Sequence, residues 1–455
     1  MKVMLINPRG HLFGRNERLS NFLDKAPVMA SFRRFWMAPC LGLLAIAAYF
    51  PKDWEICYID ENLHEIPFDE PCGLVCLSAM TAQAPRAYAI ADTYRRRGIL
   101  TVMGGIHATL LPEEAALHAD VVLAGEGEVL FPRFLEDFQA GRWGRIYREG
   151  KGGMRFSLED CITPRYDLIS SYDYPLVNVY TTRGCPRRCS FCCASNVYGP
   201  LYRRKSNEQI LSEILTVQSM FPDRLLLFSD DNLLVKRSES RELLKRMANL
   251  DLRWIAQADI SIADDAALLR LLRRSGCQWI VIGLESVSPA GLGAVDPLRF
   301  KSRYVESYRE KIAAIQDSGI GVYGTFIVGL DQDDKGIFEA TSRFILENRL
   351  YGANVTVPTP LPGTELRLFL EREGRILCND WAFYTLWDVV IQPKQMTAEE
   401  LEKGLLDVYL SISDSASADS KLREMLKAMR FSRKETRTDD GRTESVSHER
   451  QSFGN

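Results

Sequence analysis

Three cysteines stand close together in the sequence, at Cys185, Cys189 and Cys192. Thiolates at the spacing C-x-x-x-C-x-x-C can wrap one face of an iron–sulfur cube, with each sulfur binding a different iron. A structural zinc site normally closes with four ligands, and Cys193 is a poor fourth ligand because it adjoins Cys192. The spacing therefore favours a cluster with one iron left open for a small molecule.

These cysteines follow the first strand of a series of six predicted βα units. The expected strands cover 177–181, 224–229, 254–258, 279–283, 322–328 and 354–359, and the expected helices cover 207–220, 239–250, 265–275 and 303–318. Six units are more than a mononucleotide-binding half and fewer than the eight of a closed barrel. Residues 175–375 are therefore expected to form a partial (βα)6 TIM-like barrel.

The first 147 residues show a second alternation of strands and helices. The expected strands cover 2–7, 55–59, 73–78, 100–104 and 121–124, and the expected helices cover 41–50, 85–97, 112–118 and 129–140. Such a pattern favours an α/β domain with a Rossmann-like, doubly wound parallel sheet, which binds ligands beyond the carboxyl ends of its strands.

The rest of the chain divides into three shorter parts. Residues 148–174 are expected to be a linker, and residues 376–430 a C-terminal cap that is helical from Thr397. The segment 431–455 is almost free of large apolar residues, so we expect a disordered tail.

Composition narrows the class of protein further. Hydrophobic residues make up 46% of the 455 residues, which excludes a mainly disordered chain or a collagen-like rod. A formal net charge of −3 gives no electrostatic footprint for nucleic acid. The longest apolar stretch, 38–50, is too short to span a bilayer, and the N-terminus carries no apolar leader segment. We therefore expect a cytoplasmic protein without a transmembrane segment.

At the cysteine motif the sequence resembles the radical SAM superfamily, whose signature also includes the aromatic Phe191 just before the last cysteine. The resemblance implies a four-iron four-sulfur cluster on Cys185, Cys189 and Cys192. It implies that S-adenosylmethionine (SAM) chelates the open iron and is cleaved reductively to a 5′-deoxyadenosyl radical. An electron donor such as flavodoxin or ferredoxin is then an expected partner.

The resemblance also implies that SAM contacts the carboxyl ends of later strands. The acceptor-rich end of the second strand would bind the SAM amino group, although an ordinary helix cap is an alternative for it. The end of the fourth strand would bind the ribose or carboxylate, and that of the fifth would lie along the adenine. The residues expected to bind SAM are Phe191, Asp230, Asp231, Asn232, Gln257, Asp259, Glu285, Ser286, Thr325, Ile327 and Gly329.

A Rossmann-like domain before such a barrel resembles the cobalamin-binding subclass of the superfamily, over almost the whole chain up to residue 412. Small residues at strand ends would let a corrin nucleotide tail approach the backbone; the alternative is a domain that has lost its ligand. The residues expected to bind cobalamin are Ser78, Thr81, Gly104, Gly105, His107, Gly125, Glu126, Gly127 and Glu128.

One departure concerns the ligand to cobalt. Mutase-type domains carry D-x-H-x-x-G after the first strand, and this chain has Arg9 in place of the aspartate while it keeps His11 and Gly14. The missing carboxylate would orient the histidine, so a loop or substrate-contacting role for His11 is preferred over cobalt ligation.

The preferred function is that of a cobalamin-dependent radical SAM methyltransferase, acting on an unactivated carbon of a small-molecule or lipid-type substrate. Two alternatives stay open: a non-methylating radical enzyme that performs oxidation, cyclisation or rearrangement, and a non-catalytic iron–sulfur electron-transfer or sensor protein. The basic residues Arg183, Arg187, Arg188 and 203–205 could bind an anion or form a solvated face.

Overall fold

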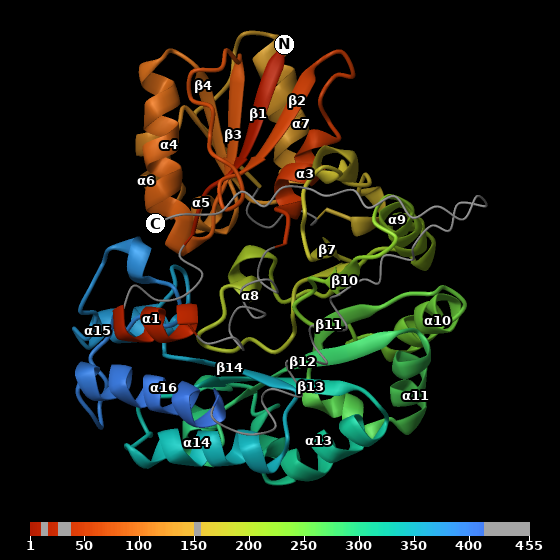
Figure 1. The fold of residues 1–455 in the computed structure, drawn as a ribbon. Coiled ribbons are helices and arrows are strands. Elements are labelled where there is room, and N and C mark those ends of the chain that lie inside the picture. Colours follow the sequence, from red (N-terminus) through yellow and green to blue (C-terminus); the bar gives the residue numbers. More distant parts are fainter. Residues whose placement is uncertain (11–16, 26–37, 150–155, 414–455) are drawn as a thin grey trace, which may run out of the picture.

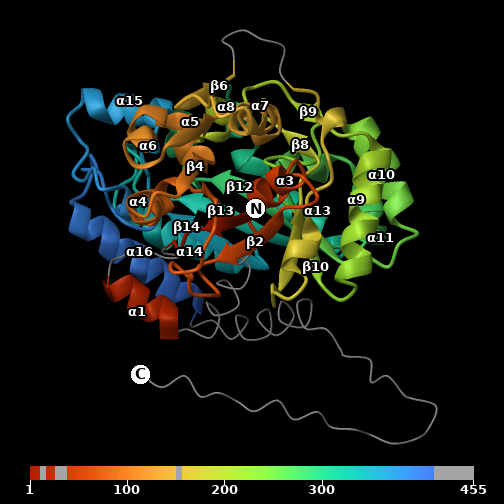
Figure 2. The ribbon, with the colours of Figure 1, turned by 90° about the horizontal axis from the view of Figure 1, so that it is seen from above.

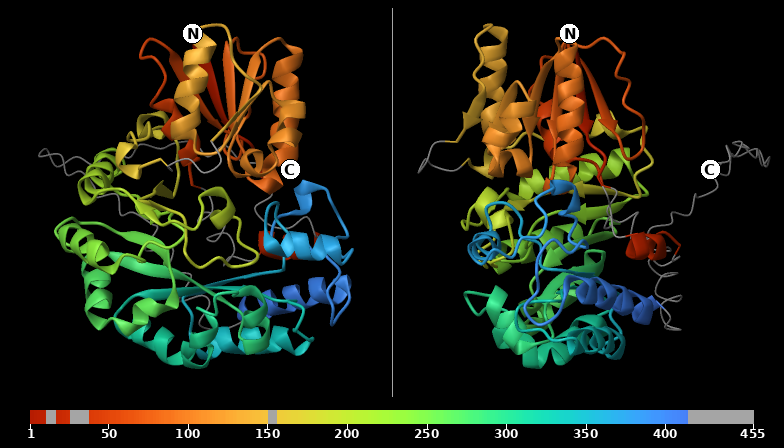
Figure 3. Two further views of the ribbon diagram at one scale, coloured as in Figure 1. Left: turned by 180° about the vertical axis from the view of Figure 1, so that it is seen from behind. Right: turned by 90° about the vertical axis from the view of Figure 1, so that its left-hand side faces the viewer.

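The computed structural model describes residues 1–10, 17–25, 38–149 and 156–413. Within these ranges the chain forms two α/β domains, and the first stands over the second (Figures 1 and 3). His11, Gly14 and the tail at 431–455 lie outside the described residues. Among the helices that are described, none is both long enough and apolar enough to cross a bilayer.

The first domain is a six-stranded, fully parallel sheet with the strand order β2-β1-β3-β4-β5-β6. Five strands confirm the expected ones, and β6 is an additional short edge strand. The bounds are β1 Lys2–Asn7, β2 Glu55–Asp60, β3 Leu74–Ser78, β4 Leu100–Gly104, β5 Val121–Ala124 and β6 Ile146–Arg148. This order places a topological switch point between β1 and β3, where open parallel sheets bind ligands.

Alternate residues of these strands pack against helices on opposite faces of the sheet, because successive side chains point in opposite directions. Met4 and Ile6 belong to the core beneath α4 and α6, whereas Val3 and Leu5 belong to the core beneath α3 and α7. Figure 2 shows these helix pairs on the two sides of the sheet. The helices of this domain are α3 Leu41–Ala47, α4 Ala84–Arg96, α5 Ile106–Leu110, α6 Pro112–His118 and α7 Gly127–Gln139. The helix α1 Glu17–Lys25 lies beside the second domain instead (Figures 1 and 3).

The second domain is a curved parallel sheet with the order β14-β13-β12-β11-β10-β7. Its end strands β14 and β7 do not pair with each other, so the barrel is partial, as predicted. The strands are β7 Leu176–Val179, β10 Leu225–Phe228, β11 Trp254–Ala258, β12 Cys277–Glu285, β13 Gly321–Ile327 and β14 Gly352–Thr356. The helices are α8 Ala194–Val197, α9 Asn207–Met220, α10 Arg237–Met247, α11 Ala266–Arg274, α12 Pro289–Val295, α13 Tyr308–Asp317, α14 Gly336–Glu347, α15 Glu365–Arg372 and α16 Ala398–Ser413.

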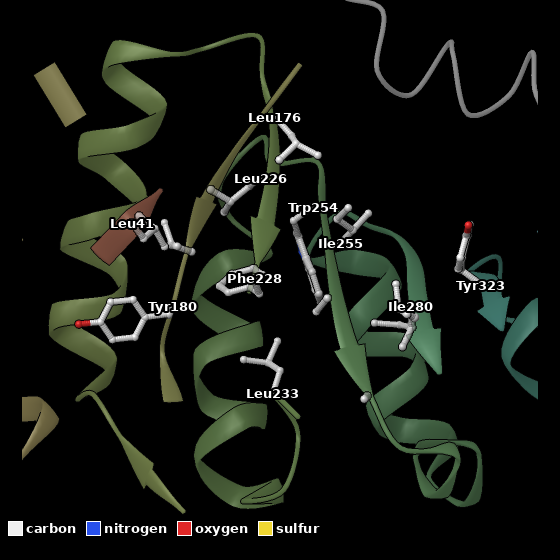
Figure 4. Close-up of a cluster of buried hydrophobic side chains, with 14 of the residues drawn as sticks. Leu41, Leu176, Tyr180, Leu226, Phe228, Leu233, Trp254, Ile255, Ile280 and Tyr323 are labelled. Carbon is white, nitrogen blue, oxygen red and sulfur yellow. The ribbon is translucent and has the colours of Figure 1, made fainter. Parts of the chain in front are cut away.

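Large apolar side chains fill the space between this sheet and its helices. Phe228 on β10 meets Trp254 on β11 edge to face, with ring centroids 5.2 Å apart (Figure 4). Both side chains are fully buried, and the indole N–H of Trp254 donates to the carbonyl of Ser275 over 2.7 Å. The core therefore fixes the relative positions of the strands whose carboxyl ends carry the site.

Two further segments bind the parts of the chain together. In the expected linker, the Tyr174 hydroxyl donates to Asp60 of the first sheet over 2.7 Å, and the Tyr166 hydroxyl donates to Glu213 of α9 over 2.7 Å. In the C-terminal cap, the Tyr409 hydroxyl of α16 donates to the carbonyl of Val355 over 2.8 Å and accepts from its N–H over 3.1 Å. The cap thus covers the β14 edge of the barrel, which would otherwise present unpaired backbone groups.

Candidate active site

The cysteine loop is held in place from several sides. It lies between β8 (Thr182–Arg183) and β9 (Arg203–Arg204), which pair with each other as a two-stranded antiparallel ribbon. Within the loop, the N–H of Ser190 donates to Val295 of α12 over 3.1 Å, and its carbonyl accepts from Leu366 of α15 over 2.9 Å. The Arg187 guanidinium lies 3.3 Å from the centroid of the Phe300 ring. The thiols therefore stand on a fixed loop at the mouth of the barrel.

The donor chemistry of this loop fits an iron–sulfur cube. Cys185, Cys189 and Cys192 are all free and half-buried. Burial raises the pKa of Cys189 to about 11 and that of Cys192 to about 12, so both are thiols until a metal displaces the proton. In the described ranges, no three His, Cys, Asp or Glu side chains gather to hold one ion. A cube takes one thiolate on each of three irons, so it suits these positions better than a single zinc ion.

Asp230, predicted to contact SAM, instead anchors the strand that leads into the cysteine loop. Its Oδ1 accepts from the N–H and hydroxyl of Thr181 over 2.9 and 3.0 Å, and from the N–H and hydroxyl of Thr182. The carboxylate is 1% exposed. Its neighbour Asp231 has an exposed side chain. The protein around the carboxyl group still displaces part of its water, and this desolvation together with the Asp230 charge raises the pKa of Asp231 to about 6. Of the two, Asp231 is the one that a ligand can reach.

Asn232 and Asp259, both predicted SAM contacts, bond to each other and to the cysteine loop. Asp259 Oδ2 accepts from Asn232 Nδ2 over 2.8 Å and from Arg187 Nη2 over 2.8 Å. Burial alone would raise the pKa of Asp259, but the hydrogen bonds from Ser261, Asn232 and Arg187 outweigh it and lower that pKa. Gln257 on β11 is the exposed member of this group. The ends of β10 and β11 are thus joined to the loop through one carboxylate.

Glu285, at the end of β12, is paired with a lysine that the sequence analysis missed. Glu285 has a φ of 63° and forms a buried ion pair with Lys301. The pair lies over Gly283, where a Cβ would come within 2.7 Å of Lys301 Nζ. The positive charge of Lys301 also lowers the pKa of Cys185 and Cys189, against the larger effect of their burial. Ser286, the next predicted contact, accepts from the N–H of Ser288 over 3.0 Å.

The predicted adenine segment covers the end of β13 and the turn after it, and a buried carboxylate fixes this turn. Gly329 has a φ of 90°, and its N–H donates to Asp333 Oδ2 over 3.1 Å. The N–H of Leu330 donates to the same oxygen over 2.9 Å. Thr325 is half-buried and Ile327 is buried. Asp333 is thus a positioning residue for this turn, and no sequence motif pointed to it.

The Asp333 carboxylate should make stability depend on pH. Burial raises the pKa of Asp333 to about 6, while Oδ1 has no hydrogen-bond partner. Stability is therefore lost as the pH rises from about 4 to about 6, because the unfolded chain releases this proton first, and the cost is complete above about pH 6. Below about pH 4 the cost vanishes, because folded and unfolded chains are both protonated. Between these values we expect the wild-type chain to lose up to about 3 kcal/mol relative to Asp333→Asn. Urea unfolding of both chains across this range measures the difference, and a constant difference would contradict the prediction.

A cavity of about 620 Å³ lies between the first domain and the barrel. It begins at the carboxyl ends of β1 and β3, marked by Asn7 and Ser78, and its barrel side includes Cys193, directly beside the cluster motif. The cap closes it with Tyr384 and Trp387. The predicted cobalamin contacts that line it are Ser78, Thr81, Gly104, Gly105, Gly125, Glu126, Gly127 and Glu128. This position and its small residues fit a corrin group at the switch point of the sheet.

His107 is the predicted cobalamin contact that the structure does not bring to the cavity. Its side chain is buried, and its Nε2 shares a hydrogen bond of 2.9 Å with the Tyr88 hydroxyl. That hydroxyl donates to Glu114 over 3.0 Å, and Glu114 also accepts from the indole N–H of Trp381 in the cap over 2.8 Å. Burial lowers the pKa of His107. The residue thus belongs to the contact between the first domain and the cap.

Gly105 is required by the backbone at the cavity wall. Its φ is 93°, and a Cβ would lie 2.7 Å from the N atom of Ala79 and 2.8 Å from Oγ of Ser78. We expect Gly105→Ala to destabilise the chain by about 3 kcal/mol, from positive-φ strain and the clash together. Gly98→Ala is the control, because Gly98 has a φ of 74° but nothing within 4 Å of a Cβ, so it should lose only about 1 kcal/mol. Equal losses in unfolding measurements on both variants would argue against the clash.

The basic residues near the motif form buried ion pairs, contrary to the expectation of an anion site or a solvated face. Arg183 binds Glu126 and Glu128, Arg203 binds Glu126, and Lys205 binds Glu213 over 2.6 Å. Arg188, in contrast, is exposed. Glu126 and Glu128 therefore line the cavity while their charges are already neutralised.

Two family models match the chain in these domains. The model of the radical SAM superfamily matches residues 179–345, and that of the B12 binding domain matches residues 37–135. The chain therefore contains a radical SAM domain. It carries the B12 binding domain of the cobalamin-binding subclass in front of the barrel, which confirms the predicted fold class and the predicted pair of cofactor domains.

Curated relatives and solved structures resemble the chain over most of its length. It is 29% identical over 385 residues to bacteriochlorophyllide d C-12(1)-methyltransferase from Chlorobaculum tepidum, covering 82% of either chain. It is 26% identical to hopanoid C-2 methylase from Rhodopseudomonas palustris, over 83% of this chain and 72% of the relative. The structure of the radical SAM methyltransferase TsrM from Kitasatospora setae, with cobalamin and a four-iron four-sulfur cluster bound, superposes with a TM-score of 0.59 at 15% identity, over 82% of this chain and 78% of the other. That superposition supports the fold.

Proposed function

We propose that this chain is a cobalamin-dependent radical SAM methyltransferase that acts on an unactivated carbon of a pigment-like or lipid-type substrate. The observation that carries the proposal is the single cavity shared by the two domains. Cys193, next to the cluster motif, lines the same cavity as Ser78 and Gly104 at the carboxyl edge of the B12 binding domain. A substrate held there would be accessible to both cofactors.

The bound groups would supply hydrogen-atom abstraction and a transferable methyl group. Cys185, Cys189 and Cys192 would hold the cluster, while Asp231 and Gln257 offer polar side chains at the barrel mouth. The corrin group would rest against the glycines at 104, 105, 125 and 127. Arg187 and Lys301 hold the surrounding carboxylates in place.

The walls of the cavity and the relatives support this substrate class. The wall contributed by the first domain is largely apolar; the barrel adds Leu361, and the cap adds Leu386 and Trp387. Relatives named for methylation of bacteriochlorophyllide and of a hopanoid take large, mostly apolar molecules. We infer a substrate of that kind, and an electron donor such as flavodoxin or ferredoxin to reduce the cluster.

Anaerobic reconstitution with iron, sulfide and hydroxocobalamin tests the proposal. Metal analysis should find about four irons and one cobalt per chain. Incubation with a strong reductant and SAM should give 5′-deoxyadenosine, and a bacteriochlorophyllide or hopanoid probe should add S-adenosylhomocysteine. A cluster and 5′-deoxyadenosine without bound cobalt would overturn the cobalamin assignment, and absence of the cluster would overturn the whole proposal.

A non-methylating reaction is the second candidate, and one observation favours it. The chain is 24% identical over 444 residues to anaerobic magnesium-protoporphyrin IX monomethyl ester cyclase from Cereibacter sphaeroides, covering 90% of this chain. Consumption of substrate with 5′-deoxyadenosine but without S-adenosylhomocysteine would identify this class. An electron-transfer protein would cleave no SAM at all.

A further inference from the structure

We propose that Arg183 is a positioning residue that couples the corrin cavity to the cluster-binding loop, so that occupation of either site strengthens binding at the other. This inference rests on the proposed function, because it assigns one ligand to each site. It concerns a four-residue ionic cluster formed by Glu126, Glu128, Arg183 and Arg203, which we call the interdomain ion cluster.

The interdomain ion cluster joins the two domains at their cofactor-facing sides. Arg183 Nη1 lies 2.6 Å from Glu126 Oε2, and Arg183 Nη2 lies 2.5 Å from Glu128 Oε1. Arg203 Nη2 lies 2.7 Å from Glu126 Oε1. Glu126 precedes α7 of the B12 binding domain and Glu128 lies in the first turn of that helix, while the two arginines face each other across the β8–β9 ribbon.

Because the interdomain ion cluster is buried, the loss of only one of its ion pairs is unfavourable. The side chains of Arg183, Arg203, Glu126 and Glu128 are 11%, 8%, 1% and 5% exposed. Two cations face two carboxylates, so the cluster is balanced, and removal of one partner would leave a buried charge uncompensated. The Tyr180 hydroxyl donates to Glu128 over 2.7 Å and fixes it further. We therefore expect the interdomain ion cluster to form or break as a unit, so that the domains are either docked or separated.

One side of the interdomain ion cluster is the cavity wall. Glu126, Glu128 and Arg183 all line the cavity, together with Gly125 and Gly127. The backbone of this turn is constrained as well, since the N–H of Glu126 donates to Glu149 over 2.6 Å. A corrin group packed against the turn would contact these residues in the docked state, and it would lose those contacts on separation. Its binding must therefore favour the docked state.

The other side of the cluster leads directly to the iron ligands. Arg183 is separated from Cys185 by Gly184 alone, and Gly184 has a φ of 85° with the carbonyl of Leu201 where a Cβ would stand. A fixed Arg183 thus fixes the start of the cysteine loop. Because coupling between two binding equilibria is reciprocal, a cluster on the loop should tighten corrin binding by the same factor.

The test measures hydroxocobalamin binding to the full chain with and without a reconstituted cluster, under anaerobic conditions. For the wild-type chain we expect the Kd to be about tenfold lower when the cluster is present. The charge-neutral double variant Glu128→Gln/Arg183→Gln should bring the two Kd values within about twofold of each other. Arg183→Lys keeps the charge but loses the two-pronged contact, so its ratio should lie between these values.

The matched control is Glu213→Gln/Lys205→Gln, which removes an equally buried ion pair that does not line the cavity. This control should keep the full tenfold ratio between its two Kd values. If buried ion pairs had only a structural role, the control and the Glu128→Gln/Arg183→Gln variant would lose this ratio to the same extent. If the double variant does not fold, Arg183→Lys decides: a ratio equal to that of the wild type overturns the coupling. The coupling is also overturned if the wild-type chain binds both cofactors but has the same Kd for hydroxocobalamin with and without the cluster. That result leaves the proposed function intact. A wild-type chain that binds no corrinoid overturns both.

Discussion

Cys189→Ala should abolish cluster assembly and, with it, the cleavage of SAM. Loss of an outer hydrogen-bond partner of a metal ligand typically costs about 10- to 100-fold in affinity, and loss of a ligand itself should cost more. In the variant, Cys185 and Cys192 would hold only two irons of the cube, which leaves a third iron without its thiolate. We expect iron and 5′-deoxyadenosine at background levels in the reconstituted variant.

Cys193→Ala is the matched control for this prediction. Cys193 is half-buried and adjoins Cys192, but its thiol lines the corrin cavity. Its replacement should therefore leave about four irons per chain and normal cleavage of SAM. Loss of the cluster in Cys193→Ala, or retention of it in Cys189→Ala, would show that a different set of thiols binds the iron.

Local patterns account for how much of the fold could be predicted. The helix α9 has the predicted bounds Asn207–Met220, because Ser206 and Gln209 cap each other's backbone N–H groups at its start. The strands were found because runs such as 3–6 are apolar and buried on both faces. The strand β6 was missed because only Tyr147 of its three residues is buried, so it carries no periodic signal.

Contacts between distant residues account for what the sequence could not reveal about the candidate site. The cysteine spacing is local and was sufficient to predict the cluster loop. Arg183 and Glu126, in contrast, are 57 positions apart, and their pairing depends on how the domains stack. The same limitation applies to Lys301 and Glu285, which meet only once the barrel has formed. For His107 the local pattern was misleading. The small residues after β4 suggested that His107 lines the cavity, but its side chain bonds to Tyr88 instead.

Replacement of the adjacent carboxylates Asp230 and Asp231 should have different effects, on stability for Asp230 and on SAM binding for Asp231. Asp230→Ala removes the acceptor of four hydrogen bonds from Thr181 and Thr182 and leaves buried donors unsatisfied. Hydrogen bonds to a charged group contribute roughly 1.5–3 kcal/mol each. Because the four share one oxygen and burial raises the pKa of Asp230, we expect a net loss of about 3 kcal/mol in unfolding free energy.

The same substitution should also weaken cluster binding, because Thr182 is followed directly by Arg183, Gly184 and Cys185. Asp231→Ala is its counterpart at an exposed position. It should change stability by less than about 0.5 kcal/mol and leave the iron content unchanged, while it raises the Kd of SAM measured on the reconstituted cluster. Asp230→Asn, which keeps an acceptor oxygen toward the threonines, should recover most of the lost stability. If Asp231→Ala destabilised the chain as much as Asp230→Ala, or if Asp230→Ala altered SAM binding alone, the division of roles between the two carboxylates would be wrong.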